Sequence, residues 1–421
     1  MKRGTSSAAV PIALTLVLLA SRLAAVPALN NPVGGTAGSL SLNPPVLYLV
    51  LAPAFTMWDG ISMLSMTRLK GFLWGLLFLY VVWRALGWAS RSRTGSGSLV
   101  GRWLRELGVL AVSITALLIF LLAGALWHRP MLSLTGTSTG DRVVDFHSHT
   151  NLSHDVAGTW MKGYDTEANL RWHSRAGFDA LFITDHNVVS RESGVGNEES
   201  GGRSLESRAA EHATVSCPGI EVSAWRAHVV LLGDTLPVDR RQYNQSLESL
   251  WRLLETSEAT YGSFSVASLP EYRRNHWHRL DTLIRAGLDG FEIVNASPKA
   301  NELTRAERDT VIGLARAHQR FVVGVSDSHG WGATSMVWNL VSLPPATPRA
   351  ALCGAIMGRL RNGFEAVQVI ERHRLRPEAW WPLALTPIGV VWETWRSMGW
   401  SLAASWLLWI WLPWGVARRR Y

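Results

Sequence analysis

The chain has 421 residues, of which 41 are Lys or Arg and 32 are Asp or Glu, with 22 Trp and only two Cys. Two cysteines exclude a small disulfide-stapled scaffold, and the length allows one to three folded units. The basic excess lies outside residues 141–376, which hold 28 acidic and 26 basic residues. This distribution argues against a basic nucleic-acid-binding domain, and no nucleic-acid partner is expected.

The residues on both sides of 141–376 have the character of membrane segments. A bilayer core is crossed by about 20 apolar residues, and the flanks contain long apolar runs at 4–21, 71–89, 107–127 and 397–417. The first run could also be a signal peptide, but no small-residue cleavage motif follows it, so an anchor is preferred. Fifteen of the 22 Trp lie in the flanks, where anchoring at the headgroup level is their expected role.

We therefore expect a multi-pass protein of the cell membrane, with the lipid bilayer as a partner. Residues 1–130 would form a membrane region of three or four helices, 141–376 the globular domain, and 377–421 a C-terminal anchor. The 14-residue uncharged stretch 379–392 is expected to lie at the membrane interface.

Sidedness follows from three basic clusters, which are Lys2-Arg3, Arg91/Arg93/Arg102/Arg105 and Arg418–Arg420. Because basic loops tend to stay in the cytoplasm, all three can share that side if residues 46–66 do not cross. The globular domain would then be extracytoplasmic. A crossing by 46–66 would move the domain to the cytoplasmic side, unless the N-terminus is outside or cleaved.

The segment 141–376 alternates strand-like and helix-like runs. Strand-like runs occur at 142–146, 179–185, 213–223, 227–233, 263–269, 289–296 and 320–327, and helix-like runs at 168–177, 246–259, 277–287 and 305–319. This alternation predicts an α/β fold of parallel β/α units, open or closed into a barrel. The Gly-, Ser- and Glu-rich stretch 191–210 is expected to be an exposed loop.

Imidazole and carboxylate side chains lie at or next to the ends of five of these strands. They are His147 and His149, then Asp185 and His186, Glu221, His228, and finally Asp327 and His329. Each has an ordinary alternative as a turn residue, a helix cap or a solvated strand end. Together they favour a metal site, because the carboxyl ends of barrel strands converge and these side chains bind Zn, Mn or Fe.

The segments DFHSHTNLSH, FITDHN, PGIEVSAWRAH, GFEIVN and GVSDSHG, in this order, resemble the PHP family. This is the polymerase and histidinol phosphatase superfamily of metal-dependent phosphoesterases. The resemblance covers roughly 141–345, and its motifs are specific only as a set. It implies a PHP-type distorted β/α barrel, here flanked by transmembrane α-helices, with two or three divalent metal ions at the strand ends.

By motif, the resemblance implies three metal positions. The first would be bound by His147, His149, Glu221 and Asp327. Glu221 would bridge to a second metal that His228 joins. The third would use His186, His329 and His154, with Asp155 as the alternative to His154. Asp185 is expected to hold its neighbour rather than bind metal.

One departure from the family concerns the second position. Family members usually carry Ala-His-Pro on a strand in mid-domain, where this chain has SVASLPEY, with Ser268 or Leu269 at the histidine position. His276 or His278 could fold back to replace it, although a basic loop or helix start is the preferred interpretation. Two possibilities stay open, a weak second site or one completed by water.

The predicted function is a membrane-anchored, metal-dependent phosphoric ester hydrolase that uses metal-activated water. Asp327, His329 and Glu221 are the expected catalytic residues. Arg226, Arg273 and Arg274 are candidates for substrate contact, although an Arg near a strand end is more often a solvated surface group. The substrate would be a phosphorylated small molecule or lipid. The alternative is a non-catalytic or regulatory membrane protein that retains a metal-binding PHP fold. Neither Cys217 nor Cys353 lies in a motif that would make it a nucleophile.

Overall fold

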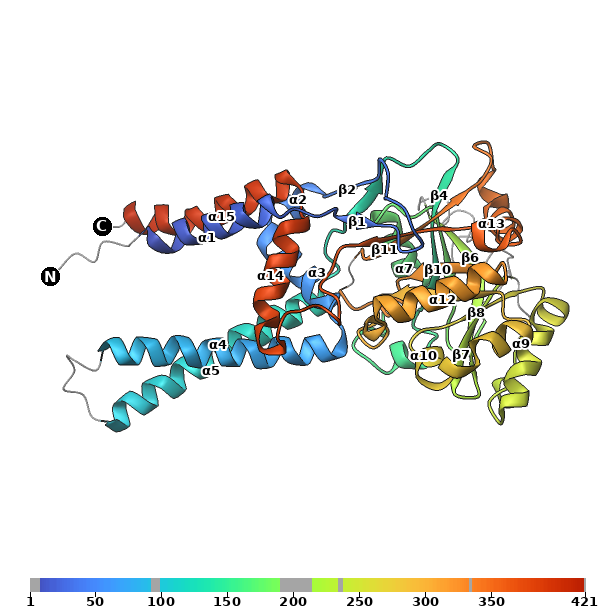
Figure 1. Cartoon of the computed structure of the whole chain (residues 1–421), viewed down its shortest axis with the longest axis horizontal. Coiled ribbons are helices and arrows are strands. Elements are labelled where there is room, and N and C mark those ends of the chain that lie inside the picture. The colour runs from blue at the N-terminus through green and yellow to red at the C-terminus, as the bar shows by residue number, and fades with distance from the viewer. Residues whose placement is uncertain (1–7, 92–98, 190–213, 234–237, 333–334, 420–421) are drawn as a thin grey trace, which may run out of the picture.

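The computed structural model describes residues 8–91, 99–189, 214–233, 238–332 and 335–419. A sheet domain forms one end of the molecule, and long helices project from it in a single direction (Figure 1). The predicted loop at 191–210 lies outside the described residues.

The domain is built on a curled sheet of ten strands in the order β1-β12-β11-β4-β5-β6-β7-β8-β9-β10. The strands are β1 (Leu29–Asn30), β4 (Asp141–Ser148), β5 (Ala180–Ile183), β6 (Val215–Ala224), β7 (Ala227–Leu232), β8 (Phe264–Ala267), β9 (Gly290–Asn295), β10 (Phe321–Val325), β11 (Val337–Ser342) and β12 (Gln368–Arg372). The α/β class is therefore confirmed, and each predicted strand is present. The short strands β2 (Ser41–Asn43) and β3 (Ser133–Thr135) pair separately.

The sheet is mixed, so the expectation of purely parallel units is wrong. Strands β4, β5 and β6 are parallel to one another, as are β8, β9 and β10. By contrast, β7 runs antiparallel to both β6 and β8, and β11 runs antiparallel to both β4 and β12. Only Trp225 and Arg226 separate β6 from β7, and two residues suffice for a hairpin but not for a crossover. Arg226 takes a positive φ of 50° in this turn.

The first and last strands of the β4–β10 series meet at the edge of the sheet where the predicted metal-binding residues lie. The backbone N–H of Asp327 donates to the His147 carbonyl at 2.9 Å, and that of His149 donates to the Ser328 carbonyl at 2.9 Å. An isolated parallel bridge joins Ser148 to Ser328. The segment after β10 is thereby fixed against the end of β4, which brings distant motifs to one place.

Helices cover the outside of the curled sheet. They are α7 (Thr166–Arg175), α9 (Leu247–Tyr261), α10 (Glu271–Asn275), α11 (Leu280–Arg285), α12 (Arg305–Ala317) and α13 (Leu352–Leu360). Reciprocal hydrogen bonds between Thr304 and Glu307 cap α12, and Ser246 and Ser249 cap α9 in the same way. Buried Val, Ile, Leu and Phe side chains of the strands and helices form one continuous core.

The remaining helices belong to the segments predicted to be membrane-associated. They are α1 (Ala9–Leu23), α2 (Val46–Val50), α3 (Ala52–Ser62), α4 (Met66–Arg91), α5 (Leu99–Leu126), α14 (Thr386–Ser397) and α15 (Trp400–Arg419). By length and composition, two stretches of the described chain could span a bilayer, Met66–Gly87 and Trp103–Leu126, and Ala9–Leu23 is apolar but shorter. Buried core helices and signal sequences pass the same test, so membrane spanning enters below as a proposal.

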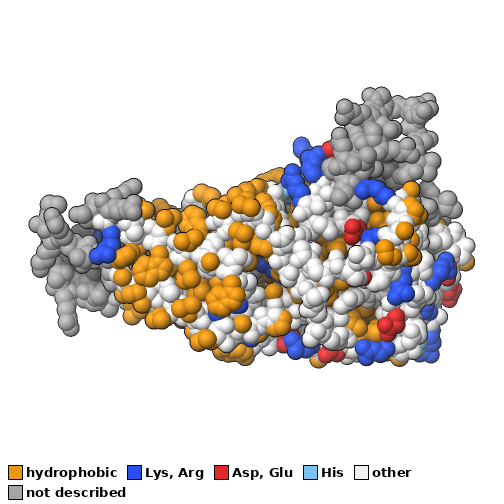
Figure 2. Space-filling model, turned by 90° about the horizontal axis from the view of Figure 1, so that it is seen from above, with side chains coloured by type: hydrophobic (Ala, Val, Ile, Leu, Met, Phe, Trp, Pro, Cys, Tyr) orange, Lys and Arg blue, Asp and Glu red, His pale blue; other side chains and the backbone are white. Residues whose placement is uncertain are grey.

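These helices form two pairs, α1 beside α15 and α4 beside α5, while α14 lies across them near the sheet domain (Figure 1). The helical half of the surface is dominated by apolar side chains, and charged side chains gather over the sheet domain (Figure 2). Short α2 and α3 lie at the junction, where α3 packs against α14 and α15. Segment 46–66 therefore folds mainly into the short helices α2 and α3 beside the domain and does not form a long apolar helix.

A buried ionic cluster ties the helices to the domain. The Asp59 carboxylate of α3 accepts from Arg129, just beyond α5, and from Arg372 of β12, each at 2.6 Å. Tyr48 of α2 donates to the same carboxylate at 2.5 Å. Removing one partner from such a buried group typically costs about 3–5 kcal/mol, so the junction holds the two parts in a defined arrangement.

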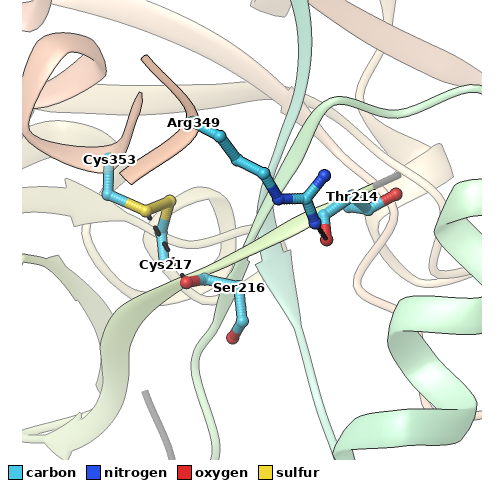
Figure 3. Close-up of a disulfide and its surroundings, with 5 residues drawn as sticks. All are labelled: Thr214, Ser216, Cys217, Arg349 and Cys353. Atoms are coloured by element: carbon cyan, nitrogen blue, oxygen red, sulfur yellow. Dashed lines mark hydrogen bonds between the residues drawn. A yellow bond between two sulfur atoms is a disulfide. The ribbon is translucent and has the colours of Figure 1, made fainter. Parts of the chain in front are cut away.

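Cys217 of β6 and Cys353 of α13 form a disulfide, with Cα atoms 5.5 Å apart and a sequence separation of 136 (Figure 3). Beside it, Arg349 donates to the Thr214 carbonyl at 3.0 Å. Sequence patterns gave these two cysteines no role, because only the packing of α13 on β6 brings them together. The bridge fixes the late helix to the centre of the sheet.

Candidate metal centre

One edge of the curled sheet collects the predicted metal-binding side chains. His147 lies near the end of β4 and His149 just after it, His186 follows β5, Glu221 and His228 face each other from β6 and β7, and Asp327 and His329 follow β10. Donor atoms within 4.8 Å of one another, on buried or partly buried residues, define three groups: His147/His149/Asp327, His186/Glu221/His228 and His149/Asp155/His186/His329.

Glu221 lies at the centre of the cluster. Its Oε2 is 3.2 Å from His147 Nε2 and 3.1 Å from His186 Nδ1, while its Oε1 is 3.1 Å from His228 Nδ1. Burial alone would raise the pKa of this carboxyl, but His147, His186 and His228 outweigh it and hold the pKa well below its ordinary value. The carboxylate can therefore face two neighbouring cations at once, as a bridging ligand must.

Asp327 completes the first group. Its Oδ1 is 3.1 Å from His149 Nε2 and 3.6 Å from His147 Nε2, and these two imidazole nitrogens are themselves 2.9 Å apart. Asp327 has a positive φ of 46°, which is uncommon outside glycine. Burial raises the pKa of its carboxyl, yet the histidines prevail and bring it to about 2.

The third group contains Asp155 where the sequence analysis named His154 first. Asp155 Oδ2 is 2.9 Å from His329 Nε2 and 3.1 Å from His186 Nε2. His154 is exposed, and its ring lies beside that of His186 with a centroid separation of 5.1 Å. The short helix α6 (His154–Ala157) turns residue 155 towards the cluster and residue 154 towards solvent, so Asp155, the alternative, occupies the expected place.

Neighbouring polar groups hold the ligand candidates in position. Asp185 accepts the N–H of Thr150 at 2.6 Å and its hydroxyl at 2.7 Å, so its carboxylate holds the loop after β4. Ser153 Oγ is 2.9 Å from His149 Nδ1 and accepts the backbone N–H of His186 at 2.8 Å. The loop after β4 thus fixes the imidazole of His149 and the backbone of His186.

Two buried acids were missed by the sequence analysis. Glu292 of β9 is 2.6 Å from His147 Nδ1 and also accepts from Asn295 Nδ2 at 2.9 Å. Asp145 of β4 is 2.9 Å from His173 Nε2 of α7. A signal was available for both: a lone carboxylate within an apolar strand must have a polar partner.

The mid-domain position that lacks the family's histidine has a different arrangement. Ser268 is buried and its hydroxyl lies 3.4 Å from Glu292 Oε2, while the Leu269 N–H donates to the same oxygen at 2.8 Å. His276 Nε2 is directed at the carbonyls of Trp225 and Arg226, at 3.2 and 3.1 Å. His276 therefore supports the β6–β7 turn instead of joining the cluster, and His278 is exposed on a short 3₁₀ turn.

The three candidate arginines differ in their surroundings. Arg273 is engaged by Glu307 through Nε at 3.0 Å and Nη2 at 3.2 Å, so its guanidinium is already paired. Arg226 is exposed, and its guanidinium lies 5.3 Å from the ring of Trp225. Arg274 is exposed on α10.

The donor set fits a cluster of divalent cations. Imidazoles and carboxylates converge at the site, and Asp155 Oδ1 is buried without a hydrogen-bond partner among the described atoms. His186 Nδ1 lies 3.1 Å from Glu221 Oε2, but not in hydrogen-bond geometry. Burial lowers and Asp155 raises the pKa of His329, with the net result at about 9. Acids and imidazoles in such direct contact form the donor arrangement that divalent cations bind.

No protein-family model matches the chain, and no curated protein matches it in sequence. Among solved structures, PsfC from Pseudomonas syringae is similar at 18% identity and a TM-score of 0.37, covering 61% of this chain and 98% of that one. A "putative metal-dependent phosphoesterase" from Bifidobacterium adolescentis is similar at 17% identity and a TM-score of 0.32, covering 45% and 88%. At these TM-scores neither likeness carries an argument, and the site geometry stands by itself.

Proposed function

We propose that the chain is a membrane-anchored, metal-dependent phosphoesterase that hydrolyses a phosphate ester with metal-activated water. The observation that carries the proposal is the sharing of donors: His149 and His186 each belong to two of the three groups. Ions held by these groups would be neighbours, and neighbouring divalent ions are typical of enzymes that act on phosphate esters. The curled sheet with its cluster at the strand ends also agrees with the PHP-type barrel that the motifs imply.

Three ion positions follow from the donor groups, for Zn, Mn or Fe. His147, His149, Glu221 and Asp327 would hold the first, His186, Glu221 and His228 the second, and His149, Asp155, His186 and His329 the third. Bound ions would lower the pKa of water and stabilise the charge that develops on the phosphoryl oxygens. The protein orients its donors: Glu292 holds His147 through Nδ1, and Ser153 holds His149 in the same way.

We further propose that α1, α4, α5 and α15 cross the bilayer and that the domain is extracytoplasmic. The outer ends of these helices lie together, away from the domain (Figure 1), and the basic clusters of the sequence adjoin these ends. Basic ends favour the cytoplasm. The Cys217–Cys353 disulfide supports the same orientation, because disulfides persist in oxidising compartments.

A non-catalytic metal-binding module is the second candidate. The observation that favours it is the Ser268-Leu269 pair, which offers no imidazole to the second ion. Metal content together with hydrolysis separates the two candidates, since a module would bind metal without turnover.

The test uses the full-length protein, purified in detergent after growth with all three metals. We expect about two or more equivalents of metal and hydrolysis of an aryl phosphate or a bis-aryl phosphate. Asp327→Asn should lower hydrolysis by at least about 100-fold and reduce bound metal, because it removes an anion from a site that must balance several cations.

The matched control is Asp239→Asn. Asp239 is exposed and caps a 3₁₀ turn away from the site, so the rate should stay within about twofold of the wild type. Less than one equivalent of metal, or full hydrolysis by Asp327→Asn at saturating substrate, would contradict the proposal.

A further inference from the structure

The apolar side chains exposed on the sheet domain gather around the metal centre. Among the described residues of 141–376, the exposed large hydrophobic side chains are Leu152 (47% exposed), Trp160 (75%), Val188 (41%) and Trp331 (41%). Each is close in sequence to a member of the cluster: Leu152 and Trp160 flank Asp155, Val188 follows His186, and Trp331 follows His329. We call these four side chains the apolar rim. Exposed apolar groups gathered in one place mark an interaction surface.

The same edge of the sheet abuts the long helices. At the start of α4, the Met66 N–H donates to the Pro298 carbonyl at 2.9 Å, and Pro298 follows β9. At the end of α5, the Gly332 N–H donates to the Ala125 carbonyl at 2.5 Å. The metal centre therefore lies on the face of the domain from which α4 and α5 depart.

The distance from the metal centre to the membrane surface can be bounded by chain length. Gly332 comes three positions after His329, which is at most about 11 Å of extended chain. The headgroup layer of one leaflet is about 5–8 Å thick. With α5 in the bilayer, the cluster lies at or just above the headgroups. Trp127, directly after α5, is 41% exposed, and its ring packs against those of Phe55 and Trp58 of α3.

Part of the cluster is open to solvent. The side chains of Asp155, His228 and His329 are 35%, 32% and 23% exposed, whereas His147, His149 and Glu221 are almost fully buried. A substrate phosphate would enter past the three partly exposed side chains, and two of these are sequence neighbours of the apolar rim. Lys162, exposed two residues after Trp160, adds a positive charge that attracts an anionic membrane surface.

We propose that the substrate is a lipid phosphoester presented from the bilayer, with the apolar rim dipping into the headgroup layer around it. The inference rests on the proposed function and on the membrane placement of α4 and α5. A water-soluble ester would have no use for exposed tryptophans around the entrance, whereas Trp favours the interface between headgroups and acyl chains. In the reaction the water oxygen bonds to phosphorus, the bond from phosphorus to the lipid alcohol oxygen breaks, and the alcohol takes up the proton that water releases.

The experiment compares two substrates with full-length protein in phosphatidylcholine vesicles. One is phosphatidic acid mixed into the vesicles, with phosphatidylglycerol as the diester counterpart, and the other is a water-soluble aryl phosphate or bis-aryl phosphate. We expect a lipid substrate to be hydrolysed with a kcat/KM at least about tenfold above that of the soluble ester. Trp160→Ala with Trp331→Ala should lower the ratio of lipid to soluble hydrolysis about tenfold, because two apolar anchors are lost.

The matched controls are Trp160→Phe and Trp331→Phe, which keep an aromatic ring and should retain most of the ratio. Trp160→Ala alone guards against a folding defect, since its side chain is 75% exposed. Hydrolysis of the soluble ester without lipid hydrolysis, or a ratio unaffected by the alanine variants, would overturn the lipid inference and leave the phosphoesterase standing. Metal-loaded protein that hydrolyses neither kind of ester would overturn the proposed function itself.

Discussion

Two adjacent residues, His154 and Asp155, illustrate how the centre is specified at the level of single side chains. Both are chemically able to bind a metal, and motif spacing does not separate them. The one-turn helix α6 points Asp155 at His186 and His329 and leaves His154 exposed. The choice between two neighbouring residues therefore depends on local backbone direction.

Asp155→Asn is expected to lower bound metal by about one equivalent, because the third ion loses its only carboxylate ligand. His154→Asn is the matched control and should leave the metal content unchanged, as its side chain faces solvent. Elemental analysis of the two purified variants decides between them. Equal loss in both, or loss only in His154→Asn, would return His154 to the centre.

Glu371 provides a pH-dependent contribution to stability outside the metal centre. It is buried 2.8 Å from Arg308 and paired with Arg376. Burial raises its pKa, but Arg376, Arg308 and Arg374 outweigh this and bring the pKa from its ordinary 4.5 to about 2. Because the folded pKa is the lower one, the contribution is fully present above about pH 4.5 and is lost as the pH falls towards 2, by about 3 kcal/mol in total.

Glu371→Gln should therefore lower the free energy of unfolding by about 3 kcal/mol at pH 7. The difference from the wild type should shrink as the pH falls from 4.5 to 2. Denaturant titrations followed by tryptophan fluorescence measure this, with exposed Glu365→Gln as the control. A difference that is constant with pH would refute the assigned role.

At the level of elements, the end of α5 is part of the site's support. His128 Nε2 lies 2.5 Å from the Gly330 carbonyl, and Arg129 donates to the Gly332 carbonyl at 2.8 Å. Both contacts hold the loop that carries His329. A domain boundary at residue 141 therefore omits residues that position a metal-ligand candidate, which is why the experiments above use the whole chain.

The disulfide between β6 and α13 supports a prediction at the level of elements. Unreduced, denatured protein should show no free thiol by maleimide labelling, and Cys217→Ala with Cys353→Ala should lower stability by about 2–5 kcal/mol, since the bridge closes a long loop. Replacing an exposed Ser on the same surface by Ala is a suitable control for the substitution itself. Two labelled thiols in the unreduced protein would contradict the pairing.

At the scale of the whole molecule, the proposed crossings by α1, α4, α5 and α15 predict sidedness. A reporter fused after Arg376 should be active only if it is of the kind that works outside the cytoplasm. This fusion lacks α15, and the domain is proposed to lie outside. The same reporter fused after Tyr421 should be active only in the cytoplasm, because α15 returns the chain across the membrane. Activity of both fusions on one side would contradict the four-crossing arrangement.

Much of the fold was predictable from periodicity. Short runs of Val, Ile and Phe between turn residues predict strands at the observed places, and amphipathic spacing predicts helices such as α12. Strand direction was less accessible. Strand β7 is antiparallel because only two residues, Trp225 and Arg226, connect it to β6. Strands β11 and β12 were missed, since neither lies in the β/α alternation.

The sequence by itself determined the chemistry of this protein: which side chains bear imidazoles and carboxylates, that they lie at strand ends, and that long apolar segments flank them. These follow from local composition and period, which need no partner. Only the tertiary structure decided that Asp155 faces the cluster, that Glu292 holds His147, that two cysteines meet, and that the candidate metal centre lies beside α4 and α5. Each of these depends on contacts between residues far apart in sequence, and such contacts form only when the sheet curls and the helices pack.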